Sequence, residues 1–165
     1  MAGLTQIASA AEVASGITRF LRGCAVSSHL TTCRDERPFR IWVGEQVREW
    51  IRAKYGSTFT VKIEPNEGGV FPVMAFGTGF WPDVSVESPD SRTFVAVKVK
   101  CLARRGLPGH VAQALGQSLL YKDPYQEVVA AFIVLDPLEA DVIADIGKRF
   151  ARYGIPIATV EPIRA

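Results

Sequence analysis

Two lysines stand two positions apart in an otherwise apolar run, TFVAVKVKCL, at residues 93–102. Alternation along a strand places Lys98 and Lys100 on one face and the intervening valines on the other. Asp83 begins the run DVSVE, and a hairpin turn through SPDSR would bring position 83 opposite positions 97–99. We therefore expect Asp83, Lys98 and Lys100 to share one neighbourhood, where ammonium groups lie beside a carboxylate.

A second group of polar residues follows in the helix predicted from about Pro108 to Lys122. Spacings of three and four residues place them in one polar stripe, which could line a site: His110, Gln113, Gln117 and Tyr121. Arg104 and Arg105, in the loop before this helix, are suited to contact a phosphate backbone without reading base sequence. The alternative interpretation is a solvated helix face and ordinary surface charge.

The hydrophobic pattern predicts an α/β fold of three layers, with a mixed central sheet flanked by helices. We expect an N-terminal helical arm over residues 1–37, with its helix at 5–22, and a domain over 38–165, forming one compact unit overall. That domain begins with a helix from Pro38 to near Tyr55. The remaining expected elements are strands at 58–65, 83–87 and 93–102, a turn at NEGG (66–69), a helix at 108–122, a strand at 127–136, a helix at 137–153 and a strand at 156–162.

Pro82 and Asp83 at a strand start, Lys100 on the next strand and Gln117-x-x-x-Tyr121 on the following helix form an ordered set. In this respect the chain resembles the PD-(D/E)XK nuclease superfamily, and in particular its RecB-like branch, over roughly residues 38–136. The resemblance implies a restriction-endonuclease-like fold with an αβββαβ core. It also implies hydrolysis of DNA with Mg²⁺ or Mn²⁺ in restriction, defence or repair, and it makes a homodimer plausible.

The resemblance also implies roles for individual residues. Asp83 would bind the metal, Lys100 would orient water or stabilise charge on phosphate, and Gln117 and Tyr121 would support the substrate. The first helix of such nucleases often adds an acid, which here would be Glu45, with Glu49 as the alternative. The residues expected to contact DNA are Arg104, Arg105, His110 and Gln113.

One position departs from the family pattern. Lys98 stands where the family has the second metal-binding acid, two residues before the lysine. An ammonium group cannot bind a divalent cation, and beside Asp83 it would exclude one electrostatically. We therefore expect the chain as written to be nearly inactive as a nuclease, unless Glu87 supplies a displaced carboxylate.

Other functions compete with this one. With Lys98 native, the chain could be a non-catalytic module that binds nucleic acid or a protein on a nuclease fold. It could also be an assembly subunit that dimerises through its apolar C-terminal helix. A half-exposed edge strand protected from aggregation by lysines would explain Lys98 and Lys100 alone, but not the Pro-Asp and helix motifs.

The composition limits the classes of function and the cellular compartments that fit this chain. A net charge of +2, from 19 Lys and Arg against 17 Asp and Glu, argues against a polycation that coats DNA. Three cysteines without CxxC spacing argue for a reducing compartment, and Cys24, His29 and Cys33 fit no standard zinc pattern. Cys101 lacks a nearby histidine, which disfavours a thiol enzyme. The absence of a signal-like or membrane-spanning segment leads us to expect a soluble, cytoplasmic protein.

Overall fold

Strand β6 (Ser91–Leu102) lies in the middle of a six-stranded sheet with the order β1-β8-β7-β6-β5-β2. The computed structural model describes residues 7–27, 30, 35–64 and 72–163, without the side chains of Arg92 and Thr93. Strands β6, β7, β8 and β1 are parallel, whereas β5 is antiparallel to both β6 and β2. The other strands of this sheet are β1 (Ala25–Val26), β2 (Thr60–Ile63), β5 (Val84–Ser88), β7 (Glu127–Val134) and β8 (Ile157–Pro162).

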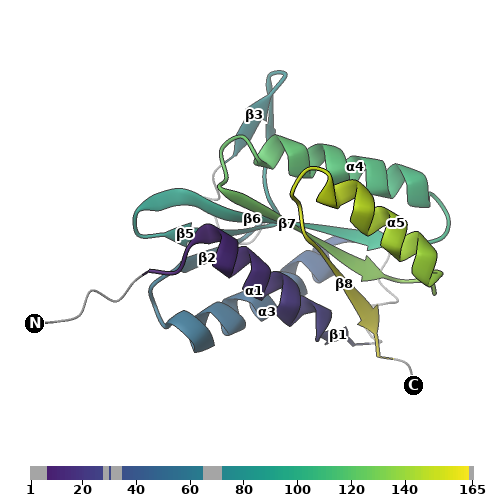
Figure 1. The fold of residues 1–165 in the computed structure, drawn as a ribbon, viewed down its shortest axis with the longest axis horizontal. Helices are drawn as coiled ribbons and strands as arrows, with labels where there is room; N and C mark the ends of the chain where they lie inside the picture. Colours follow the sequence, from purple (N-terminus) through teal and green to yellow (C-terminus); the bar gives the residue numbers. More distant parts are fainter. Residues whose placement is uncertain (1–6, 28–29, 31–34, 65–71, 164–165) are drawn as a thin grey trace, which may run out of the picture.

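Helices cover both faces of this sheet (Figure 1). Helices α4 (Leu107–Tyr121) and α5 (Ala140–Ala151) connect the parallel strands on one face, and α1 (Ala10–Arg22) and α3 (Arg37–Tyr55) cover the other. Alternation along β6 separates two cores, because Val97 and Val99 pack toward α1 and α3 while Ala96 and Leu102 pack toward α4 and α5. This arrangement confirms the predicted mixed α/β sheet flanked by helices.

The N-terminal helix is confirmed from Ala10 onward, after a capping box in which Ser9 and Glu12 bind each other's backbone N–H groups. Its side chains Val13, Ile17 and Leu21 are fully buried in the same core as those of α3. The N-terminal helix therefore forms part of the layer beneath the sheet.

Several expectations differ from the structure. The stretch before Asp83 contains a separate hairpin, β3 (Val73–Ala75) and β4 (Thr78–Phe80), which stands away from the sheet (Figure 1). Strand β1 is too short to give a periodic signal, and α5 begins at Ala140 rather than Pro137. The expected turn at 66–69 lies outside the described residues, as do residues 28–29 and 31–34 of the stretch SSHLTTCRDERP (27–38), which we expect to form a loop.

Two glycines in helices make a matched test of packing. A Cβ atom on Gly44 in α3 would lie 2.6–2.8 Å from three carbons of buried Ile63, whereas one on Gly116 in α4 would meet nothing within 4 Å. We expect Gly44→Ala to lower the free energy of unfolding by about 1–3 kcal/mol through overpacking. Gly116→Ala should raise the free energy of unfolding of the monomer by about 0.5–1 kcal/mol through helix propensity. Urea unfolding of both variants measures this, and equal effects would contradict the packing described for α3 and β2.

Candidate functional site

The site forms where β6 continues beyond its neighbour. Strand β5 begins at Val84, which pairs with Val97, so the described part of β5 leaves the last residues of β6 without a partner on that side. Carboxylates take the place of the missing strand. Asp83 Oδ2 accepts from the N–H of Val99 at 2.6 Å, and Glu36 Oε1 accepts from the N–H of Cys101 at 3.4 Å.

Each of these acids also meets a lysine of β6. Lys98 Nζ lies 2.8 Å from Asp83 Oδ2, and Lys100 Nζ lies 2.7 Å from Glu36 Oε1. Lys98 is 4% exposed and Asp83 is 2% exposed, so this pair is almost completely removed from water. The predicted proximity of Asp83 to Lys98, and the register that places residue 83 opposite 97–99, are therefore confirmed, whereas Lys100 pairs with Glu36 instead.

Arg40, one turn into α3, joins the two pairs. Its Nε lies 3.0 Å from Asp83 Oδ1 as an ion pair without hydrogen-bond alignment, and its Nη2 lies 3.3 Å from Glu36 Oε2. These five residues, Glu36, Arg40, Asp83, Lys98 and Lys100, are called the ion-pair cluster below. The cluster contains three cations and two acids, so its formal charge is positive.

Titration of the cluster follows from these contacts. Burial acts to raise the pKa of Glu36, but the hydrogen bond and charge of Lys100 outweigh it, so this pKa lies below its ordinary value. Burial acts to lower the pKa of Arg40, and the charges of Asp83 and Glu36 reverse that effect and raise it. Both groups are therefore held in their charged forms.

Cys101, next to Lys100, is buried beside this cluster. Burial first, and then the negative charge of Glu36, raise the pKa of its thiol to about 12. A thiol with that pKa stays protonated at neutral pH, which agrees with the expectation that Cys101 is not a nucleophile.

Tyr121 lies on the buried side of α4 and is 1% exposed. Its hydroxyl donates to the carbonyl of Trp81 at 2.7 Å, immediately before Pro82 and Asp83. Burial is the main cause that raises the pKa of Tyr121. Tyr121 therefore positions the Pro-Asp segment through its backbone, while Gln117, one turn earlier, is half-buried.

The other residues expected in the polar stripe have different surroundings. His110 is half-buried in the first turn of α4, and its buried Nδ1 has no hydrogen-bond partner among the described residues. Gln113 is exposed. Exposure thus varies along the predicted stripe, from exposed Gln113 to buried Tyr121.

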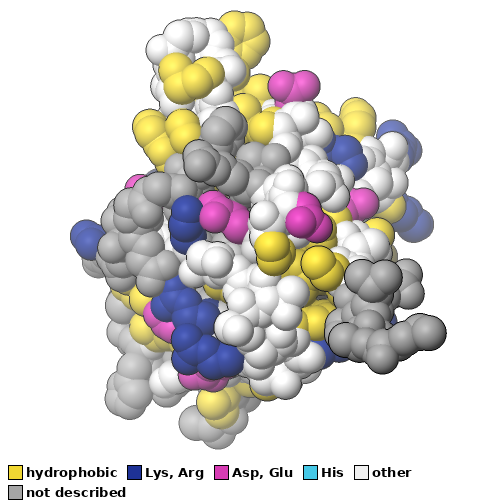
Figure 2. All heavy atoms as spheres, turned by 90° about the vertical axis from the view of Figure 1, so that its left-hand side faces the viewer, with side chains coloured by type: hydrophobic (Ala, Val, Ile, Leu, Met, Phe, Trp, Pro, Cys, Tyr) yellow, Lys and Arg dark blue, Asp and Glu magenta, His cyan; other side chains and the backbone are white. Residues whose placement is uncertain are grey.

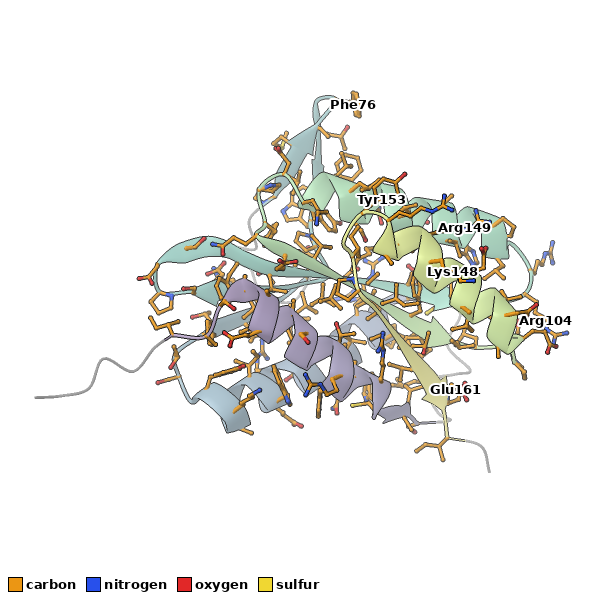
Figure 3. All side chains as sticks on the ribbon, viewed as in Figure 1. Phe76, Arg104, Lys148, Arg149, Tyr153 and Glu161 are labelled. Atoms are coloured by element: carbon orange, nitrogen blue, oxygen red, sulfur yellow. The ribbon has the colours of Figure 1, made fainter. Side chains whose placement is uncertain are left out.

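The remaining predicted residues form contacts elsewhere. Arg104 lies near the start of α5, where its backbone N–H binds Asp136 and its Nε donates to the carbonyl of Pro137 (Figure 3). Arg105 is exposed. Glu45 pairs with Arg48 at 2.9 Å, Glu87 pairs with Lys62 at 3.0 Å, and Glu49 is exposed.

The donor set does not fit a divalent cation. Asp83 Oδ2 already meets an ammonium group and an N–H, and Oδ1 faces the Arg40 guanidinium. Within the described residues, His, Cys, Asp and Glu form no group of three or more that could hold a metal ion. Magnesium and manganese prefer several oxygen ligands, whereas the nearest neighbours of Asp83 are cationic.

Glu36 and Arg40 are the cluster residues that the sequence analysis missed. Their spacing of four residues in DERPFR was the available signal, because it places both on one face of a helix end. The acid predicted from the resemblance, Glu45, lies farther along the same helix.

Comparison of the chain with protein-family models, with curated proteins and with solved structures found no match. None of the helices in the described ranges combines the length and the apolar character needed to cross a membrane. Interpretation of the site therefore depends on its own geometry.

The first prediction from this geometry concerns the Lys98–Asp83 pair. Lys98→Met should destabilise the fold by about 3–5 kcal/mol, because a buried carboxylate loses its closest cation. In an Asp83→Asn background the same change should cost much less, giving a coupling energy of about 2–3 kcal/mol in chemical unfolding. Lys62→Met, which breaks the more exposed pair with Glu87, is the control and should cost below about 1 kcal/mol. A coupling energy near zero would show that the buried pair is not formed.

A second prediction concerns acid stability. Because the pKa of Glu36 is lowered in the folded state, the unfolded state binds more protons at this group as the pH falls. Glu36 therefore stabilises the fold above its ordinary pKa of 4.5, and this contribution is lost as the pH falls through the lower folded-state value. Urea unfolding between neutral pH and pH 3 should show a shallower acid loss in Glu36→Gln than in the wild-type chain. Identical slopes would contradict the Glu36–Lys100 contact.

Proposed function

We propose that this chain is a PD-(D/E)XK nuclease-like domain in which Lys98 holds the metal position, so that it binds DNA without hydrolysing it. The observation that carries the proposal is the contact of 2.8 Å between Lys98 Nζ and Asp83 Oδ2, in place of a second carboxylate. The resemblance implies magnesium-dependent hydrolysis of DNA. In this chain, Lys98 would disable that activity.

Element order supports a restriction-endonuclease-like fold. Helix α3, strands β2, β5 and β6, helix α4 and strand β7 follow one another as an αβββαβ series, with the hairpin β3–β4 inserted. Pro82 and Asp83 come directly before β5, Lys100 lies on β6, and Tyr121 hydrogen-bonds the carbonyl of Trp81, just before Pro82. These residues therefore occupy the elements on which the family carries its motif.

The charge of the cluster supports loss of hydrolysis. Hydrolysis by this family requires a divalent cation held by paired carboxylates, which also supplies the charge that stabilises phosphate. Here Asp83 is neutralised by Lys98 and Arg40, and Glu36 by Lys100 and Arg40. Positive charge is thus supplied by fixed side chains, which can attract a phosphate but cannot generate a metal-activated water.

Exposure indicates how DNA could meet this charge. Arg40 is the most exposed cation of the cluster, with 32% of its side chain accessible, whereas Lys98 and Lys100 lie deeper at 5% and 11%. A phosphate would therefore meet the Arg40 guanidinium first, and Arg105 adds an exposed cation on the loop that follows β6. Binding through such contacts should weaken steeply as salt rises.

The test is to restore the missing carboxylate. Lys98→Glu places two acids side by side, so the variant should be less stable than the wild-type chain without metal and should gain stability when Mg²⁺ or Mn²⁺ is added. A gain of about 3 kcal/mol is expected at a hundredfold excess of metal over Kd. Thermal unfolding with and without metal, together with plasmid cleavage, measures this, and the wild-type chain should show neither a metal effect nor cleavage.

Two control variants separate the possible outcomes. Lys98→Gln removes the charge without adding a ligand, so it should not gain metal binding, and Lys98→Glu with Asp83→Ala should lose what Lys98→Glu gains. Metal-dependent cleavage by the wild-type chain would refute the proposal of a disabled site. A folded Lys98→Glu that binds DNA but never responds to metal would refute the nuclease-like site and leave a DNA-binding module.

A further inference from the structure

The hairpin β3–β4 ends in a turn that its sequence does not favour. Ala75 pairs with Thr78, so Phe76 and Gly77 form a two-residue turn with φ of 52° and 76°. Turns with two positive φ values favour Asn-Gly, because a bulky residue is strained there. Phe76 is nevertheless 99% exposed, so packing within the described chain does not compensate for the strain.

Figure 2 shows this hairpin as a projection that carries hydrophobic side chains at the top of the molecule. Phe76 stands at its tip, beyond the outer surface of α4 (Figure 3). No residue from Pro72 to Trp81 is charged, and Met74 is 67% exposed. The hydrogen bond from Tyr121 to Trp81 fixes the base of the hairpin to the C-terminal end of α4. The hairpin therefore presents an apolar tip, and its base is joined to α4 by this hydrogen bond.

A groove that could receive such a group lies at the other end of α4. Its volume is about 280 Å³, and it lies between the first half of α4 and α5. A cavity of about 150 Å³ already holds benzene, so the groove has room for one aromatic ring. Its lining is mostly apolar and consists of Leu107, Pro108, Val111, Ala112, Leu115, Val142, Asp145, Ile146 and Arg149. The two charged residues of this lining, Asp145 and Arg149, pair with each other at 2.8 Å.

The outer face of α4 connects the hairpin with the groove. This helix contains no Lys, Arg, Asp or Glu over its 15 residues, and its outward positions Gly109, Ala112 and Gly116 are exposed and small. A Cβ atom on Gly109 or Gly116 would meet nothing within 4 Å, so packing inside the described chain does not require glycine there. Glycine inside a helix costs stability, whereas small residues permit close approach of another backbone.

Charge at the two ends of α4 suits an antiparallel partner of the same kind. Arg105 is exposed just before the helix, and Asp123 is exposed just after it. Lys122, next to Asp123, directs its ammonium group toward Gly154 of its own chain. That group would lie 3.6 Å from a Cβ atom built on Gly154. Two antiparallel copies of α4 would therefore bring each Arg105 near the other copy's Asp123.

We propose that two copies of this chain pair through antiparallel α4 helices, with Phe76 of each copy inserted into the α4–α5 groove of the other. A two-fold axis makes the contact reciprocal, since the hairpin stands at one end of α4 and the groove at the other. The uncharged outer faces of α4 then meet without electrostatic repulsion, and the two Arg105–Asp123 pairs flank them. This pairing is independent of DNA binding and of the state of the ion-pair cluster.

The test is sedimentation of the wild-type chain and its variants over a range of concentrations. The wild-type chain should be dimeric well below about 100 μM, as expected of a specific interface of standard size. Phe76→Asn should raise the dimer dissociation constant at least about tenfold. It should not lower the Tm measured on the monomer, because asparagine suits the positive φ. Ala112→Arg should also dissociate the dimer, and Ile163→Asn, an exposed apolar site on another edge, should not.

Two further measurements define the geometry. Arg105→Asp and Asp123→Arg should each weaken the dimer. The double variant should restore it, because both ion pairs between positions 105 and 123 then form again with their charges exchanged. Mixed Phe76→Cys and Ala112→Cys chains should form a disulfide-linked heterodimer, whereas Phe76→Cys should not cross-link when alone. A monomeric wild-type chain overturns the proposal, and so does a dimer that tolerates both Phe76→Asn and Ala112→Arg.

Discussion

The difference in length between β6 and β5 determines the arrangement of the candidate site. Strand β6 runs to Leu102 beside β7, but its pairing with β5 ends at Val97. The N–H groups of Val99 and Cys101 would lose their hydrogen bonds in a buried setting without another acceptor, which is costly. Carboxylates meet this need, and each buried carboxylate then requires a cation. Lys98 and Lys100 on β6 supply these cations.

Stability alone does not explain why charged side chains, and not apolar ones, cover the end of β6 that β5 leaves unpaired. Buried ion pairs recover little more than their desolvation cost, and apolar residues of similar volume often serve equally well. The ion-pair cluster nevertheless keeps five charged side chains drawn from α3, β6 and the segment before β5. An apolar closure would leave Asp83 without its cations, so the charged residues of the cluster depend on one another. Beside Asp83, a fixed ammonium group destabilises the fold less than a second carboxylate would in the absence of a metal ion.

Strand periodicity explains which parts of the site could be predicted. Alternation with a period of two placed Lys98 and Lys100 on one face, and the short SPDSR turn limited the register of Asp83. Strand periodicity could not identify Glu36, because its contact with Lys100 depends on where the N-terminal end of α3 packs against the sheet. Helical spacing grouped Tyr121 with Gln113, but the packing of α4 on the sheet decides that one is buried and the other exposed. The hairpin escaped prediction because glycines interrupt its alternation.

Helix α4 connects the ion-pair cluster with the β3–β4 hairpin through the hydrogen bond from Tyr121 to Trp81. Tyr121 fixes the carbonyl of Trp81 from the inner side of the helix, and Trp81 stands between the hairpin and the Pro82–Asp83 segment. The position of Asp83 in the ion-pair cluster and the position of the Phe76 tip are thus set from the same point. Phe76 and Gly116 each reduce local stability, Phe76 through its positive φ and Gly116 through its low helix propensity, and both are exposed. A local cost that packing within the described residues does not offset is what an interface with another copy would maintain.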